Sequence, residues 1–114
     1  MSNSFNKETK LCVSISSTPG NIGATIHNEA YNYLGLNFVY LPLKPKDAKS
    51  AIAAVRSLNI RGCSVSMPFK EEVMKYIDTM SQEAEKIGAI NTIVNDLGVL
   101  KGYNTDYDSV LWSF

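Results

Sequence analysis

Short runs of β-branched and other apolar residues alternate along the chain with segments that repeat apolar residues at helical spacing. Residues 11–16, 37–44 and 60–67 are runs of the first kind and predict three strands. Between them, residues 24–35 and 46–59 predict two helices. The second helix has an apolar stripe made of Ala48, Ala51, Ile52, Val55 and Leu58. This strand-helix-strand order favours parallel strands joined by right-handed crossovers.

The second half of the chain predicts a different arrangement. Residues 69–77 and 81–89 predict two short helices, the second capped by Ser81. Two strand candidates at 90–96 and 99–106 flank a turn, and their spacing predicts an antiparallel hairpin. The expected fold is therefore an α/β domain, a three-layer α/β/α sandwich with a mixed, mostly parallel sheet.

The length of the chain, 114 residues, suits one small domain with a modest core. We expect residues 1–10 to be a flexible N-terminus and residues 11–108 to form the folded domain. Residues 109–114 begin a helix that has no stop signal and ends in apolar residues. They are expected to pack on something outside this domain.

Composition excludes several classes of function. Lys and Arg together number 11, as do Asp and Glu, so the net charge is zero. The excess of basic residues that is typical of nucleic-acid-binding proteins is therefore absent from the sequence. No apolar run approaches the length of about 18 residues that predicts a membrane span. Cys12 and Cys63 lie in apolar strand runs and predict buried free thiols in a cytoplasmic protein. His27 is the only histidine, so a metal site is not expected.

Polar residues gather where the predicted parallel strands end, which is the edge at which ligands bind in open α/β sheets. The segments concerned are residues 17–23, "MPFK" at 67–70 and "NTD" at 104–106. These segments predict a small-molecule site. Its candidate residues are Asn21, Ser66, Lys70, Asn91, Thr105 and Asp106.

Lys70 and Asp106 admit two interpretations. A lysine beside an aspartate can exchange a proton with a substrate hydroxyl or carbonyl if the site is partly dry. The same two residues at the surface would form an ion pair worth ~0–1 kcal/mol and without function. Spacing alone favours the surface pair.

Other polar and aromatic residues also have simple structural interpretations. Asn91 and Asn104 are equally consistent with bridging turns through side-chain to backbone hydrogen bonds. His27 is expected to be a helix-surface or tucked residue rather than a base. Three tyrosines are expected to be core or half-buried packing residues, namely Tyr31, Tyr33 and Tyr40.

Three motifs in fixed order resemble one family. Its N-V-T-x-P-x-K, G-A-x-N-T and G-x-N-T-D segments correspond to "SVSMPFK" at 64–70, "GAINT" at 88–92 and "GYNTD" at 102–106. A further "IHN" at 26–28 matches a helix start of that family. Over nearly its whole length the chain thus resembles the substrate-binding N-terminal domain of shikimate dehydrogenase, and it looks like the divergent shikimate dehydrogenase-like branch.

The resemblance implies a function and residue roles. It implies that Lys70 and Asp106 are catalytic, in an NADP-dependent interconversion of shikimate and 3-dehydroshikimate. This reaction belongs to the shikimate pathway of aromatic amino acid biosynthesis. The residues implied to bind the substrate are Asn21, Ser66, Asn91 and Thr105.

The chain departs from the family pattern at two places in the site. The family's S-x-S-P segment, which grips the substrate carboxylate, is replaced so that Asn21 and Gly23 stand for the serines and Ala24 for the proline. Ser64 stands where the family has asparagine in its third strand. The carboxylate contact is therefore altered, and a quinate dehydrogenase-like substrate is an open alternative.

No G-x-G-x-x-G segment occurs in the chain, so NADP is expected to bind to a nucleotide domain that follows residues 109–114. The chain alone is then expected to be inactive. Two alternatives are a free-standing small-molecule binding module and a look-alike substrate domain of a folate dehydrogenase or malic-type enzyme. Edge strands and the apolar last helix also leave a homo-oligomer open.

Overall fold

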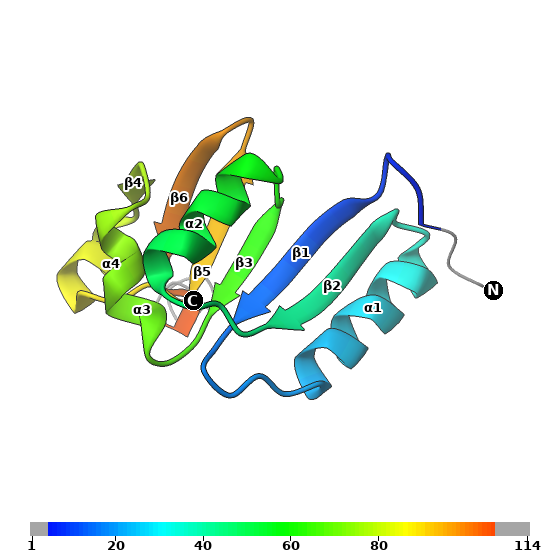
Figure 1. The fold of residues 1–114 in the computed structure, drawn as a ribbon, viewed down its shortest axis with the longest axis horizontal. Helices are drawn as coiled ribbons and strands as arrows, with labels where there is room; N and C mark the ends of the chain where they lie inside the picture. Colours follow the sequence, from blue (N-terminus) through cyan, green and yellow to red (C-terminus); the bar gives the residue numbers. More distant parts are fainter. Residues whose placement is uncertain (1–4, 107–114) are drawn as a thin grey trace, which may run out of the picture.

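Six strands form one sheet in the computed structural model, which describes residues 5–106 (Figure 1). The strand order across the sheet is second, first, third, fifth, sixth, fourth. In chain order the elements are β1 (Lys10–Ile15), α1 (Ile22–Leu34), β2 (Phe38–Leu43), α2 (Ala48–Ser57), β3 (Gly62–Val65), α3 (Phe69–Glu72), the 3₁₀ turn η1 (Val73–Lys75), β4 (Thr79–Met80), α4 (Gln82–Ile87), β5 (Thr92–Asp96) and β6 (Val99–Tyr103).

The sheet is mixed, as the sequence predicts. β1 pairs in parallel with β2 and β3, and β5 pairs antiparallel with β3 and β6. The predicted hairpin is therefore confirmed, and β6 runs in the same direction as β3. β4 is a two-residue strand parallel to β6 that the sequence did not predict, because two residues show no periodicity.

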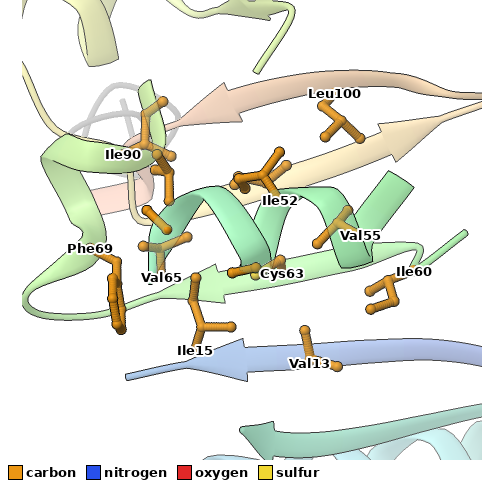
Figure 2. Packing of buried hydrophobic residues seen from close by; sticks show 14 of the residues in the cluster. Val13, Ile15, Ile52, Val55, Ile60, Cys63, Val65, Phe69, Ile90 and Leu100 are labelled. Carbon is orange, nitrogen blue, oxygen red and sulfur yellow. The ribbon is translucent and has the colours of Figure 1, made fainter. Parts of the chain in front are cut away.

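Helices lie on both faces of the sheet. Alternate residues of β1 point to opposite faces. Val13 and Ile15 point toward α2 and pack in one cluster with Ile52 and Val55 (Figure 2). On the other face, α1 lies along β2, where the His27 ring stacks on Tyr40 with centroids 4.3 Å apart. The three-layer arrangement is confirmed.

The main core lies between the sheet and the helices on the α2 face. Its most deeply buried members, each 0% exposed, are Val73, Ala84, Ile90, Ile93 and Leu100. Cys63 belongs to the same cluster, and burial raises the pKa of its thiol to about 12. The prediction of a buried free thiol is thus confirmed for Cys63, whereas Cys12 is a half-buried free thiol.

Several packing predictions are wrong. Leu58 follows the end of α2 and is 67% exposed, so it does not continue the buried stripe. Tyr33 is 90% exposed, although Tyr31 is half-buried and Tyr40 is buried as expected. The reason for the exposure of Tyr33 is that α1 packs mainly on the edge strand β2 and buries only Ala24 fully.

The ends of several elements also differ from the prediction. The single helix expected over residues 69–77 is instead the one-turn helix α3 followed by η1. Ser81 and Asp47 cap α4 and α2 with their side-chain oxygens, as their positions indicate. The last predicted helix, at residues 109–114, lies outside the described residues. Within residues 5–106, no helix is long and apolar enough to cross a membrane.

Candidate functional site

The ends of β1 and β3 meet at one edge of the sheet because the two strands are parallel. Beyond them, the backbone N–H of Ser66 donates to the carbonyl of Ile15 at 3.0 Å. The N–H of Ser17 donates to the carbonyl of Met67 at 3.3 Å. The loop after β1 and the "SVSMPFK" segment are therefore joined, as expected for strands that end at the same edge.

The "GAINT" segment lies between the other two motifs and bonds to both. The Asn91 carbonyl accepts from the Val65 N–H at 2.8 Å, and the Asn91 N–H donates to the Tyr103 carbonyl at 3.0 Å. One residue earlier, the Ile90 N–H donates to the Lys70 carbonyl at 2.9 Å. These bonds hold "SVSMPFK", "GAINT" and "GYNTD" together as one cluster.

The Asn91 side chain extends this cluster to the start of the last segment. Its Oδ1 accepts from the Thr105 backbone N–H at 2.8 Å and from the Thr105 hydroxyl at 3.2 Å. The Thr92 hydroxyl also donates to the same oxygen, at 3.0 Å. Asn91 is half-buried and Thr105 is exposed, so this group borders solvent. Two of the predicted substrate residues are thus in direct contact.

Lys70 is half-buried in the short helix α3, and its neighbours Glu71 and Glu72 are exposed. Asp106 is exposed and follows Thr105 directly. Among residues 5–106, no ion pair joins Lys70 to Asp106 or to another carboxylate. The surface ion pair considered from spacing is therefore absent within the described part of the chain, although both residues belong to the joined cluster.

The remaining predicted residues flank the cluster. Ser66 is exposed at the end of β3, where its carbonyl accepts from the Phe69 N–H at 2.9 Å. Asn21 is exposed and occupies the N-cap position of α1, but its side chain makes no capping hydrogen bond. A Cβ atom built on Gly23 would have no neighbour within 4 Å, so the space of the family's second serine is open.

A row of hydroxyl groups beside the cluster was missed by the sequence analysis. Ser14, Ser64, Thr92 and Tyr103 are paired in register across β1, β3, β5 and β6, so their side chains share one face of the sheet. The buried Tyr40 hydroxyl donates to Ser64 Oγ at 2.8 Å. The available signal was a polar residue at each of these strand ends, opposite the buried alternate positions.

His27 and Asn104 make structural hydrogen bonds. The partner of His27 Nδ1 is the Gly23 carbonyl at 2.8 Å, so this nitrogen must carry the hydrogen and donate it. This bond ties the second turn of α1 back to its start. Asn104 is 8% exposed, and its Nδ2 donates to the Ala89 carbonyl at 3.3 Å, so it bridges two segments of the cluster.

Two further observations bear on what the site can hold. A hollow of about 340 Å³ lies on the α2 face, lined among others by Leu43, Pro45 and Val55, and it includes none of the six candidate residues. Residues 5–106 contain no group of three His, Cys, Asp or Glu side chains that could hold a metal ion. The six candidate residues offer amide, hydroxyl, ammonium and carboxylate groups.

Comparison with known proteins agrees with this arrangement. The model of the family described as Shikimate dehydrogenase substrate binding domain matches residues 13–93. The chain belongs to the shikimate dehydrogenase family. The matched residues contain the "SVSMPFK" and "GAINT" segments and exclude "GYNTD".

Curated relatives from this family are considerably longer than the chain. A shikimate dehydrogenase-like protein from Haemophilus influenzae is 51% identical over 107 residues, which are 94% of this chain and 40% of the relative. A shikimate dehydrogenase (NADP(+)) from Dehalococcoides mccartyi is 51% identical over 88 residues, or 75% of this chain and 31% of the relative. The chain thus spans about two fifths or less of these relatives.

Solved structures of shikimate dehydrogenases have the same fold. A shikimate 5-dehydrogenase-like protein matches with a TM-score of 0.92 and 49% identity, over 96% of this chain and 41% of the other. The shikimate 5-dehydrogenase from Listeria monocytogenes, crystallised with shikimate and NAD, matches with a TM-score of 0.87 and 37% identity. That match covers 99% of this chain and 40% of the other.

Proposed function

We propose that residues 11–108 are the substrate-binding domain of an NADP-dependent shikimate dehydrogenase-like oxidoreductase that interconverts shikimate and 3-dehydroshikimate. The main support is the hydrogen-bonded cluster around Asn91, which joins the three motifs that carry Ser66, Lys70 and Thr105. Membership of the family and relatives named as NADP(+) enzymes support the same reaction. The reaction belongs to aromatic amino acid biosynthesis, and the two free thiols suit a cytoplasmic protein.

The residues of this chain contribute the transfer of one proton to this reaction. NADP⁺, held by another domain, would accept the hydride from the substrate carbon when the hydroxyl is oxidised to a ketone. The hydroxyl proton passes to the Lys70 amine, and reduction returns it to the oxygen. Lys70 suits this role because it is half-buried and has no carboxylate partner among the described residues. Asp106 accepts a hydrogen bond from a substrate hydroxyl and orients it toward the amine.

The substrate residues divide by the group that they bind. Asn91 and Thr105 bind ring hydroxyls from one wall, and Ser66 contributes its hydroxyl from the end of β3. Asn21 binds the carboxylate through its side-chain amide, which makes no capping bond in α1. Gly23, at the position of the family's second serine, has no hydroxyl to donate. The carboxylate is therefore bound more weakly than by the two serines that the resemblance implies.

Residues 5–106 offer no phosphate-binding loop for NADP. Gly98 and Gly102 lie in the β5–β6 hairpin rather than in a turn from a strand to a helix, so they form no phosphate-binding loop. We assign the cofactor to a nucleotide domain reached through residues 109–114. The chain alone is then inactive but retains its substrate site.

Titration of the ¹⁵N-labelled chain with shikimate and, separately, with quinate tests this proposal. We expect millimolar shikimate to shift the amide signals of Asn21, Asn91 and Asp106. Asn91→Ala should lose the response, whereas Asn32→Ala should keep it because Asn32 is exposed near the C-terminal end of α1, away from the end that follows Asn21. No shift with either ligand would overturn the proposal, and shifts with quinate alone would replace the substrate.

A further inference from the structure

The orientation of the Asn91 side-chain amide is fixed by chemistry. The Thr105 backbone N–H can donate but cannot accept, and it lies 2.8 Å from the atom assigned as Asn91 Oδ1. A flipped amide would place an NH₂ group against this donor, so the oxygen must face Thr105. The Asn91 Nδ2 group therefore points away from Thr105, and it has no partner among the hydrogen bonds of the described residues.

Thr92 donates a further hydrogen bond to the same oxygen. Its hydroxyl donates to Asn91 Oδ1 at 3.0 Å from the next position in the chain. Thr92 is half-buried and pairs with Ser64 on β3 and Tyr103 on β6, on the face of the hydroxyl row. Its neighbour Ile93 points into the core on the opposite face and is 0% exposed. A change of the Thr92 side chain therefore leaves the core intact.

The Asn91 oxygen has more donors than it needs. A carbonyl oxygen has two lone pairs, but three groups donate to Oδ1, and the longest of these bonds comes from the Thr105 hydroxyl at 3.2 Å. This hydroxyl can therefore turn its hydrogen toward a ligand. The Thr92 hydroxyl and the Thr105 N–H then keep the oxygen in place.

We propose that Thr92 is a positioning residue of the substrate site, which locks the Asn91 amide so that Nδ2 donates to an oxygen of the ligand. The inference rests on the proposed function, because it assumes that the ligand lies against Asn91. It adds a chemical requirement: the ligand atom opposite Nδ2 must be an acceptor, such as a hydroxyl or carbonyl oxygen. An ammonium or other donor at that place is rejected.

Substitution of Thr92 separates positioning from direct contact. Thr92→Val has nearly the same shape but no hydroxyl, and Thr92→Ser restores the hydroxyl. The matched control is Thr79→Val, which changes an exposed threonine of β4 at the far edge of the sheet. Each variant of the 114-residue chain is titrated with shikimate, and the Asn91 side-chain NH₂ signals are recorded with and without ligand.

We expect Thr92→Val to weaken shikimate binding about fivefold, the effect of losing one neutral hydrogen bond. It should also shift the Asn91 NH₂ signals in the free chain. Thr92→Ser should restore both properties, and Thr79→Val should leave both unchanged. Asn91→Asp keeps the acceptor oxygen but loses both Nδ2 hydrogens, so its loss of binding should be at least as large.

Two outcomes would overturn the inference. One is shikimate binding by Thr92→Val as tight as that of the unchanged chain. The other is an Asn91 NH₂ signal that Thr92→Val does not move in the free chain. The second readout needs no ligand, so it decides the role of Thr92 even if the unchanged chain fails to bind shikimate, a result that contradicts the proposed function instead.

Discussion

The side chain of Asn28 pairs with both backbone polar groups of Tyr40. Its Nδ2 donates to the Tyr40 carbonyl at 2.9 Å, and its Oδ1 accepts from the Tyr40 N–H at 2.8 Å. Tyr40 lies in β2, one of the two edge strands of the sheet, so these two groups would otherwise have no strand partner. Asn28 therefore acts as a one-residue substitute for a neighbouring strand, which protects this edge from pairing with another chain.

Removal of this pairing should destabilise the domain. We expect Asn28→Ala to lower the free energy of unfolding by about 1–3 kcal/mol, because Tyr40 is buried and would keep an unpaired donor and acceptor. Asn32→Ala changes an exposed asparagine of the same helix and serves as the control. Urea unfolding measures both variants. Equal stability of the two would show that the pairing contributes nothing.

Lys70 should be needed for turnover and not for folding. In a protein that joins this chain to an NADP-binding domain, we expect Lys70→Ala to lower kcat by roughly 10²–10⁴-fold, the range for loss of an acid-base group. The control is Lys75→Ala, which removes an exposed lysine paired with Glu72 at 3.4 Å. Steady-state kinetics and thermal unfolding test the pair. Undiminished turnover in Lys70→Ala would exclude its proton-transfer role.

Gly23→Ser should strengthen binding of a carboxylate ligand. The new side chain meets no atom within 4 Å of its Cβ, and it returns the hydroxyl that the resemblance places there. One added hydrogen bond to a carboxylate predicts about tenfold tighter binding of shikimate by calorimetry. Gly20→Ser, also in open space, should change nothing. The gain should disappear with the methyl ester of shikimate, and its persistence would contradict the assignment.

Leu97 is a strained residue in the β5–β6 turn. Its φ is 52° and that of Gly98 is 95°, so both central residues of the turn are left-handed. Leu97 is also 96% exposed, so its side chain gains little from packing. We expect Leu97→Asn to raise the free energy of unfolding by about 1 kcal/mol, since asparagine tolerates this conformation.

The control for this change is Leu58→Asn, at an exposed leucine whose φ is −95°. That substitution relieves no strain and should not stabilise the domain. Chemical unfolding of both variants distinguishes the two effects. A Leu97→Asn variant that is no more stable than the unchanged chain would show that the turn carries no such strain.

Asp78 should make the stability of the domain sensitive to acid. The Arg56 guanidinium donates to Asp78 Oδ2 at 3.0 Å and the Leu100 N–H donates to it at 2.8 Å, and these bonds lower the pKa of the carboxyl. A lowered pKa in the folded state means that this stabilisation is complete above the unfolded value of about 3.9 and is lost as the pH falls below it.

Asp78→Asn removes this dependence. We expect the unchanged chain to be more stable than the variant at neutral pH and the difference to shrink below about pH 4. Thermal unfolding at a series of pH values measures the difference. A gap that stays constant down to about pH 3 would mean that the carboxyl is not the source of the effect.

The sequence predicted the elements well because the apolar periodicity of the strands and helices is a local property. Whether a side chain is buried depends on which other elements pack over it, and this is not a local property. Tyr33 and Leu58 fit the apolar stripes of their helices, but no other element covers them, so both are exposed. The candidates Asn91 and Thr105 were predicted from polar residues near the ends of the predicted strands, and the order of the motifs then implied their roles. The role of Thr92 was missed because it depends on strand register and on the direction of one amide.

The two backbone bonds of Asn91 also bear on how the domain folds. They join Asn91 to Val65 on β3 and to Tyr103 at the end of β6. The bond to Val65 links segments that are far apart in sequence, so it forms after the chain entropy of closing that loop has been overcome. We therefore expect the hydrogen-bonded cluster around Asn91 to assemble late in folding. A molecule that binds there would act as a pharmacological chaperone. It would bind the folded chain and not the unfolded chain, and so it would shift the equilibrium toward the folded state.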